Sequence, residues 1–113
     1  MASDDWSDQE QKAMALLGMT LERDIEAAVC DYAKTQGMLV YKFTSPARAA
    51  VPDRLFITAR GIVFFIEFKR TGQKPTPPQL REHQRLRQQN VVVHVIDDVD
   101  DGKFIVDRMA RTL

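Results

Sequence analysis

Three features that mark other classes of protein are almost absent from this sequence. Cys30 is its only cysteine, which excludes an internal disulfide and a cysteine-rich zinc site. No apolar run comes near the roughly 20 residues that span a bilayer. The acidic start, MASDDWSDQEQ, lacks the basic flank and the apolar stretch of a signal peptide. We therefore expect an intracellular, cytoplasmic protein with no membrane partner.

A net charge is missing too, since sixteen Lys and Arg residues balance sixteen Asp and Glu residues. The two signs are nevertheless unevenly distributed. Residues 34–89 contain eleven basic side chains and three acidic ones, so this segment carries +8 and the two flanks together carry −8. A basic segment within a neutral chain is expected of a protein that grips phosphates on one face. On charge alone, a solvated basic surface is an equally good interpretation.

A chain of 113 residues has room for one compact domain. Hydrophobic periodicity predicts a short helix within an N-terminal extension (residues 1–20), followed by a single domain over residues 21–113. Within that domain the pattern predicts a helix over 21–37, strands over 38–43, 53–58 and 62–70, a helix over 77–89, a strand over 91–96 and a final helix within 97–113. This order predicts an α/β fold in which helices flank a mixed central sheet.

Polar residues in capping positions mark where three of these helices should begin. Ser7 and Glu10 have the three-residue spacing of a capping box, and so do Thr76 and Gln79. Thr20 is a possible N-cap of the second helix. At the start of the first and of the third predicted helix, we therefore expect the side chain of each of the two residues to bond to the backbone N–H of the other.

The most informative polar residues lie at the end of the hydrophobic segment IVFFIEFKR (62–70). Side chains alternate along a strand, so Glu67 and Lys69 share one face. Asp53 begins the preceding strand. Two antiparallel strands joined by a tight turn place the start of one beside the end of the other. We therefore expect Asp53 and Glu67 to converge.

Two carboxylates in one place repel each other unless a cation that prefers hard oxygen ligands lies between them. Magnesium or manganese meets this requirement. Lys69 could then orient or deprotonate a water molecule and support a phosphate group. The plainer alternative is an ion pair at a strand edge, with Asp53 closing a turn after Pro52.

The residues VPD at 51–53 and EFK at 67–69 have the form PD, spacer, ExK, and so resemble the PD-(D/E)XK nuclease superfamily. The ordered series ERDIE, YAKTQG, KFTSP, VPDRLFI, FFIEFKRTGQKPTPPQ and VVVHVID is more specific, and it is similar to the stand-alone VRR-NUC domain of phages and bacteria. The resemblance implies a restriction-endonuclease-like core (αβββαβ) that hydrolyses DNA phosphodiester bonds with one or two divalent metals. It also implies branched DNA substrates such as Holliday junctions or flaps, often a homodimer, and a bacterial or phage-infected cell.

By motif position, the resemblance makes Asp53 and Glu67 metal ligands and adds the backbone carbonyl of Phe68 as a further ligand. It makes Lys69 the catalytic lysine. Gln79 lies where the family has a glutamine in the helix after the active-site strand, and it could contact the metal-bound water or a phosphate. Its capping-box position is an equally good explanation.

The family also carries a glutamate in the first helix of its core, where this chain offers Glu22 and Glu26. On a helical wheel Glu22 lies roughly 60° from the centre of the apolar arc, and Glu26 lies roughly 100° from it. Glu22 is thus better placed to point toward the sheet, and Glu26 is expected to face solvent. Either could instead be a plain surface residue near a helix N-terminus. We expect Glu22 to be the fourth member of the site.

Basic and polar residues around this expected site are candidates for DNA contact. As a group they could follow the sugar-phosphate backbone, although each alone could be a solvated charge. They are Lys42, Ser45, Arg48, Arg54, Arg70, Lys74, Arg81, Arg85 and Arg87. His83 and His94 lack the spacing of a zinc pair, and we expect neither in the site.

Three hypotheses follow: an active, structure-directed DNA endonuclease, a nuclease-like nucleic-acid-binding module without activity, and a nuclease that acts on RNA. The carboxylates and the lysine of the motif are all present, which argues against the second. No aromatic stretch of the kind that stacks on RNA bases is present, which argues against the third. A magnesium- or manganese-dependent deoxyribonuclease is the function we expect.

Overall fold

The computed structural model describes residues 7–113, apart from the side chains of residues 14 and 15, so the first six residues of the expected extension lie outside the described part. The elements in chain order are α1 (Asp8–Leu16), α2 (Glu22–Thr35), β1 (Leu39–Lys42), β2 (Arg54–Ile57), β3 (Val63–Phe68), α3 (Pro77–Gln88), β4 (Val92–Ile96) and α4 (Val99–Ala110). From α2 to β4 the order is the predicted αβββαβ. None of the described helices is both long and apolar enough to cross a membrane.

The four strands form one mixed sheet in the order β1-β2-β3-β4. β1 and β2 are antiparallel, as are β2 and β3, whereas β3 and β4 run parallel. The β2–β3 connection is short, and Gly61 within it has a φ of +81°, which glycine adopts without strain. The parallel pair requires a crossover, which α3 provides. The predicted α/β fold with a mixed sheet is confirmed.

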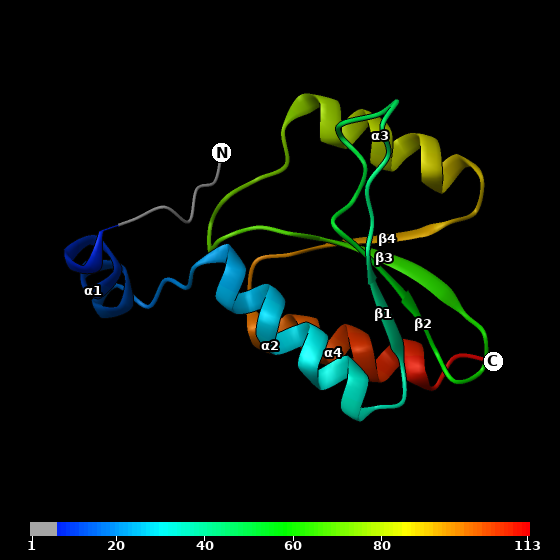
Figure 1. The fold of residues 1–113 in the computed structure, drawn as a ribbon, viewed down its shortest axis with the longest axis horizontal. Helices are drawn as coiled ribbons and strands as arrows, with labels where there is room; N and C mark the ends of the chain where they lie inside the picture. Colours follow the sequence, from blue (N-terminus) through cyan, green and yellow to red (C-terminus); the bar gives the residue numbers. More distant parts are fainter. Residues whose placement is uncertain (1–6) are drawn as a thin grey trace.

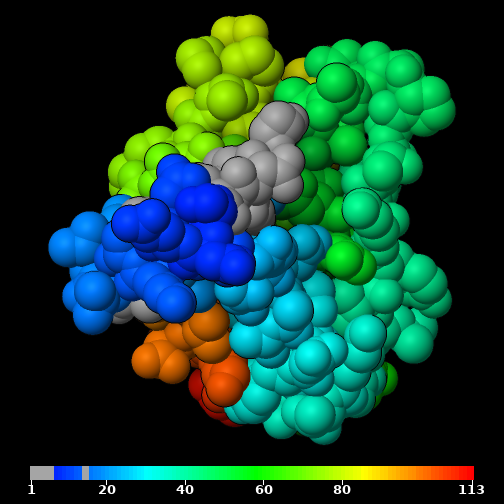
Figure 2. Space-filling view, turned by 60° about the vertical axis from the view of Figure 1, so that its left-hand side comes forward, coloured from blue at the N-terminus to red at the C-terminus, as the bar shows by residue number. Residues whose placement is uncertain are grey.

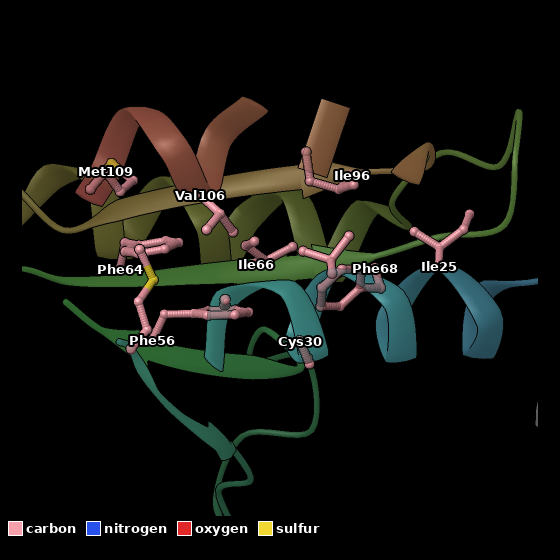
Figure 3. Packing of buried hydrophobic residues seen from close by; sticks show 12 residues of the cluster. Ile25, Cys30, Phe56, Phe64, Ile66, Phe68, Ile96, Val106 and Met109 are labelled. Atoms are coloured by element: carbon pink, nitrogen blue, oxygen red, sulfur yellow. The ribbon is translucent and has the colours of Figure 1, made fainter. Parts of the chain in front are cut away.

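Helices cover both faces of this sheet (Figure 1). α2 and α4 pack together on one face, and α3 lies on the other. The main hydrophobic core fills the space between the sheet and the α2–α4 pair (Figure 3). Its central side chains are Ile25, Val29, Phe56, Phe64, Ile66, Phe68 and Val106, all fully buried.

The close packing of α2 against α4 depends on Gly102. A Cβ atom at this position would collide with the side chain of Val29. The absence of a side chain on Gly102 therefore lets the two helices approach, and they form a continuous layer under the sheet.

Two of the three predicted helix starts are present. Ser7 and Glu10 bond reciprocally at the start of α1, and Thr76 and Gln79 do the same at the start of α3. The prediction for Thr20 is wrong, because the residue before α2 is Leu21, which makes no side-chain capping bond. The backbone N–H of Thr20 instead donates to Oγ1 of Thr71 at 3.0 Å, which ties this residue to the loop after β3.

α1 lies at one end of the molecule, and no other described helix or strand has Cα atoms within 8 Å of it. In the space-filling view it forms a bulge beside the start of α2 (Figure 2). The division of the chain at residue 20 into an extension and a domain stays a prediction.

Candidate active site

Asp53 and Glu67 meet at the end of β3. The β2–β3 register pairs Arg54 with Ile66, which places Asp53, one residue before β2, opposite Glu67. The backbone N–H of Phe68 donates to Oδ2 of Asp53 at 2.8 Å and holds this carboxylate at the strand end. The charge of Asp53 raises the pKa of Glu67, so the two carboxyl groups lie within electrostatic reach of each other. Strand alternation and a tight turn therefore bring together the two acids that the sequence singled out.

Glu67 is buried between the sheet and α3 with 2% of its surface exposed. Its Oε2 accepts a hydrogen bond from Nε2 of Gln79 at 3.2 Å and lies 3.7 Å from Nζ of Lys69. Its Oε1 has no hydrogen-bond partner. Burial and the neighbouring charge of Asp53 raise the pKa of Glu67 to about 8. The side chain therefore holds a proton near neutral pH unless a cation replaces that proton.

The pKa of Asp53 is shifted in the same direction as that of Glu67. Burial raises the pKa of Asp53, and the N–H of Phe68 opposes this shift only in part. Lys69 is itself buried, with 6% of its surface exposed. Buried Glu67 and Lys69 thus lie beside the half-buried carboxyl group of Asp53. Burial strengthens the charge interactions among them.

The two candidate glutamates of α2, Glu22 and Glu26, differ in their relation to this cluster. Glu26 forms an ion pair with Arg54, with 2.6 Å between Oε2 and Nε, and its side chain is 22% exposed. The expectation that Glu26 faces solvent is therefore wrong, because Arg54 draws it onto β2. The charge of Glu22, which is half-buried, raises the pKa of Glu67 and so lies within electrostatic reach of it. The role of Glu22 as a ligand stays a prediction.

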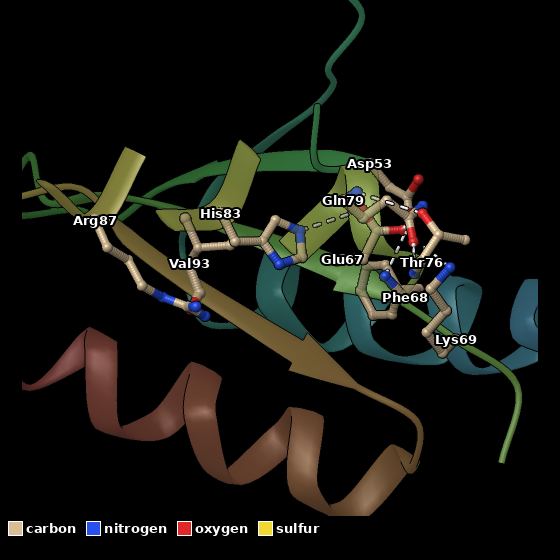
Figure 4. Close-up of polar contacts among 9 residues, drawn as sticks. All are labelled: Asp53, Glu67, Phe68, Lys69, Thr76, Gln79, His83, Arg87 and Val93. Carbon is tan, nitrogen blue, oxygen red and sulfur yellow. Dashed lines mark hydrogen bonds and ion pairs between the residues drawn. The ribbon is translucent and has the colours of Figure 1, made fainter. Parts of the chain in front are cut away.

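Gln79 completes the capping box and also contacts Glu67. Its contact with a metal-bound water or a phosphate stays a prediction. Its side-chain oxygen accepts from the backbone N–H of Thr76 at 2.9 Å, which completes the capping box. Its side-chain nitrogen donates to Glu67 (Figure 4). The start of α3 is therefore fastened to the carboxylate cluster by a residue that also fixes the start of the helix.

His83 is a site residue that the sequence alone did not reveal. It is fully buried on α3, with Nε2 3.8 Å from Oε1 of Glu67, and neither ring nitrogen has a hydrogen-bond partner. Burial lowers its pKa. Its spacing of four residues from Gln79 places both on one helix face, and this spacing was the available signal. His94 is half-buried beside the ring of Phe64, away from the cluster.

Several of the basic residues expected to contact DNA are engaged within the fold. Arg54 pairs with Glu26. Arg48 and Arg85 both pair with the buried Glu82, at 2.7 Å and 3.3 Å, so the β1–β2 loop is fastened to α3. Arg87 donates from Nη2 to the backbone oxygen of Val93 at 2.6 Å. Each of these arginines therefore uses at least one of its N–H groups within the fold, where it holds a loop, strand or helix in place.

Other candidates line hollows on the two sides of the β1–β2 loop. Lys42 and Ser45 line a hollow of about 320 Å³ that also contains Asp53. Arg81 lines a second hollow of about 280 Å³ together with Ala49 and Pro78. Lys74 is exposed and Arg70 is half-buried in the loop after β3. The predicted contacts of these residues with DNA stay predictions.

The donors at this site suit a divalent cation. Asp53 and Glu67 offer two mutually repelling carboxylates, and one oxygen of Glu67 is buried without a partner. Hard oxygen ligands of this kind are those that magnesium and manganese prefer. No group of three or more Asp, Glu, His or Cys side chains within residues 7–113 is arranged to hold a metal. A cation here would therefore need ligands beyond these two side chains, from the backbone, water or substrate.

Comparison with known proteins gives two close likenesses, although no protein-family model matches the chain. Over 79 residues it is 44% identical to "Putative nuclease p44" of Acyrthosiphon pisum secondary endosymbiont phage 1, which covers 70% of this chain and 85% of that protein. A solved structure described as a VRR-NUC domain superposes with a TM-score of 0.71 at 31% identity, covering 76% of this chain and 94% of the other. Both likenesses extend over most of the chain, and the descriptions of both proteins refer to a nuclease.

Proposed function

This chain belongs to the VRR-NUC family of nucleases, and we propose that it is a magnesium- or manganese-dependent endonuclease that hydrolyses phosphodiester bonds in DNA. The observation that carries the proposal is the pairing of half-buried Asp53 with buried Glu67, beside buried Lys69. A carboxyl group whose pKa is raised to about 8 by burial and by a second acid is poorly placed for a structural role. It is well placed to exchange its proton for a cation.

Asp53 and Glu67 would hold the cation, with the carbonyl of Phe68 as a backbone ligand. Glu22 of α2 would have to move closer to serve as a further carboxylate, since no three such side chains are arranged for a metal within residues 7–113. Such a cation supplies charge neutralisation at the phosphate and makes a water molecule more acidic. The chain's own residues orient the reactants. The N–H of Phe68 and the amide of Gln79 each fix one carboxylate, at 2.8 Å and 3.2 Å, before substrate arrives.

Lys69 provides the positive charge that a cleaved phosphodiester requires. Its Nζ lies 3.7 Å from Glu67, and its burial keeps water from screening it. An ammonium group in this position can hydrogen-bond to the attacking water and to a phosphate oxygen, on which negative charge accumulates as the bond breaks. Lys69 is therefore the residue that we assign to water orientation and to transition-state stabilisation.

We propose branched DNA, such as a Holliday junction or a flap, as the substrate, and a homodimer as the active form. The site lies beside the end of β1, the β1–β2 loop and α3, which carry Lys42, Ser45 and Arg81, respectively, along the two hollows. A single small domain offers one such site. Paired cuts across a four-way junction need two sites related by a two-fold axis, which is the commonest symmetry of oligomers.

Cleavage of labelled DNA by the purified chain tests the proposal. The wild type and Asp53→Ala are incubated with Mg²⁺ or Mn²⁺ and a four-way junction, a flap, a linear duplex or single-stranded RNA. We expect metal-dependent cutting that favours the branched substrates. We expect Asp53→Ala to cut at least about 100-fold more slowly, because it loses a ligand of the cation. Exposed Asp31 on α2 supplies the control variant Asp31→Asn, which should cut like the wild type.

The outcomes separate the alternatives. Equal cutting by Asp53→Ala and wild type would mean that the active site lies elsewhere. Preference for RNA over every DNA would make the protein a ribonuclease. Binding of branched DNA without any metal-dependent cutting would make it a binding module.

A further inference from the structure

Helix α3 presents two polar side chains to Glu67, one turn apart. Gln79 donates to one carboxylate oxygen, Oε2, at 3.2 Å. His83, four residues later, directs Nε2 toward the other oxygen, Oε1, at 3.8 Å (Figure 4). The two oxygens of this carboxylate therefore face two different nitrogen atoms of the same helix.

The contact between His83 and Glu67 is incomplete. A separation of 3.8 Å is too long for a hydrogen bond, and both ring nitrogens of His83 and Oε1 of Glu67 are buried without any partner. These three atoms are the unpartnered buried side-chain atoms within the described residues. Buried polar atoms without partners destabilise a fold, whereas an apolar side chain of similar size would fill the same space without that cost. Two unsatisfied partners that face each other indicate a bond that forms in another state of the site.

We propose that His83 is a positioning residue, whose Nε2–H donates a hydrogen bond to Oε1 of Glu67 when a divalent cation occupies the site. The inference rests on the proposed function. Closing the gap needs a shift of about 1 Å, and hydrogen bonds in active sites commonly tighten on ligand binding. A neutral imidazole has one N–H to donate, and a carboxylate that has released its proton accepts at both oxygens. α3 then grips both oxygens of Glu67 and fixes the direction of the carboxylate toward the cation.

This role predicts opposite effects on metal binding and on stability. Hydrogen bonds that orient metal ligands contribute about 10- to 100-fold to metal affinity. His83→Leu removes the donor and also removes two unpartnered buried nitrogens. We expect it to bind Mn²⁺ about 10- to 100-fold more weakly than the wild type, while its metal-free melting temperature stays equal or rises. A purely structural histidine would instead lower the melting temperature when replaced and leave Mn²⁺ affinity unchanged.

Isothermal titration calorimetry with MnCl₂ on the full chain, paired with thermal unfolding in the absence of metal, makes this measurement. His83→Gln is the matched variant, because its side-chain amide nitrogen can take the place of Nε2. It should bind Mn²⁺ within about threefold of the wild type on the argument that the donor is retained. If His83→Leu does not fold, His83→Met supplies a more adaptable apolar side chain for the same comparison.

Wild-type Mn²⁺ affinity in the folded leucine or methionine variant would overturn the role of His83, and so would equal losses in the apolar and glutamine variants. A wild-type chain that bound no Mn²⁺ and cut no DNA would overturn the proposed function itself. A wild type that binds and cuts, together with an apolar variant that binds equally well, would overturn only the assignment of His83.

Discussion

The two faces of the sheet differ in what they bury. On the α2–α4 side, β3 contributes Phe64, Ile66 and Phe68, each with no exposed surface. On the α3 side, the same stretch contributes Phe65, Glu67 and then Lys69, which are almost as deeply buried. One strand thus supplies both a hydrophobic core and a buried charged cluster, because its side chains alternate between the faces. The stability of the domain comes mainly from the first face, and the candidate active site lies on the second.

Buried polar atoms without hydrogen-bond partners, which destabilise a fold, are found on the α3 side. The unpartnered buried side-chain atoms of the described residues belong to Glu67 and His83. Glu82, also buried on α3, avoids this cost because Arg48 and Arg85 both pair with it. Glu67 and Glu82 thus differ in that one oxygen of Glu67 has no partner, whereas Glu82 fastens a loop to a helix.

The largest effect on stability is expected from the hydrophobic face. Phe64 is fully buried and stacks on Phe56 with ring centroids 4.9 Å apart. Phe64→Ala should lower the free energy of unfolding by about 3–5 kcal/mol, because it leaves a cavity that its neighbours fill only in part. Urea denaturation followed by circular dichroism measures this change.

Phe104 provides the matched control, since it is 60% exposed on α4. Phe104→Ala should change the free energy of unfolding by no more than about 0.5 kcal/mol. Similar losses in both variants would contradict this account, because an exposed phenylalanine of α4 would then contribute as much stability as a buried one.

A smaller effect, with the opposite sign, is expected from the α3 face. The pKa of Glu67 is raised from 4.5 to about 8 in the folded chain. Between these values the folded protein keeps a proton that the unfolded chain has released, so the stability that this group contributes falls as pH rises. Glu67→Gln cannot ionise and should not show this part of the fall.

Differential scanning calorimetry in the presence of a chelator tests this sign. Between about pH 5.5 and about pH 8.5, the melting temperature of the wild type should fall relative to that of Glu67→Gln. The difference should reach several degrees, since about 1 kcal/mol shifts a domain of this size by about 4 °C. Parallel curves for the two proteins would mean that Glu67 titrates at its ordinary pKa and carries no burial penalty.

The cluster could be predicted from sequence to the extent that it depends on local rules. Alternation along β3 and the tight turn after β2 were sufficient to bring Asp53 beside Glu67. The capping box of Thr76 and Gln79 followed from spacing alone. Such rules concern residues that are close in sequence or directly paired between strands. They hold whichever helix packs over these residues.

The remaining features depend on tertiary contacts that periodicity cannot express. Glu26 was expected to face solvent, yet Arg54 from β2 draws it inward. Threonine is a residue type favoured at N-caps, but the backbone N–H of Thr20 donates to Thr71 in a loop far away in the sequence. His83 is predicted to lie outside the site, whereas the α3 crossover places its Nε2 3.8 Å from the carboxylate of Glu67 on β3. Each of these depends on which helix packs over which strand.

The effect of Mn²⁺ on melting temperature, in wild type and Glu67→Gln, tests most directly whether the buried carboxylates are kept for a cation. At a concentration of about 100 times its dissociation constant, a bound ion adds about 2.7 kcal/mol to the stability of the folded state. The wild type and the control Asp31→Asn should therefore melt at a higher temperature with Mn²⁺, and Glu67→Gln should not. An equal rise in all three proteins would contradict the account, because Mn²⁺ would then bind without Glu67.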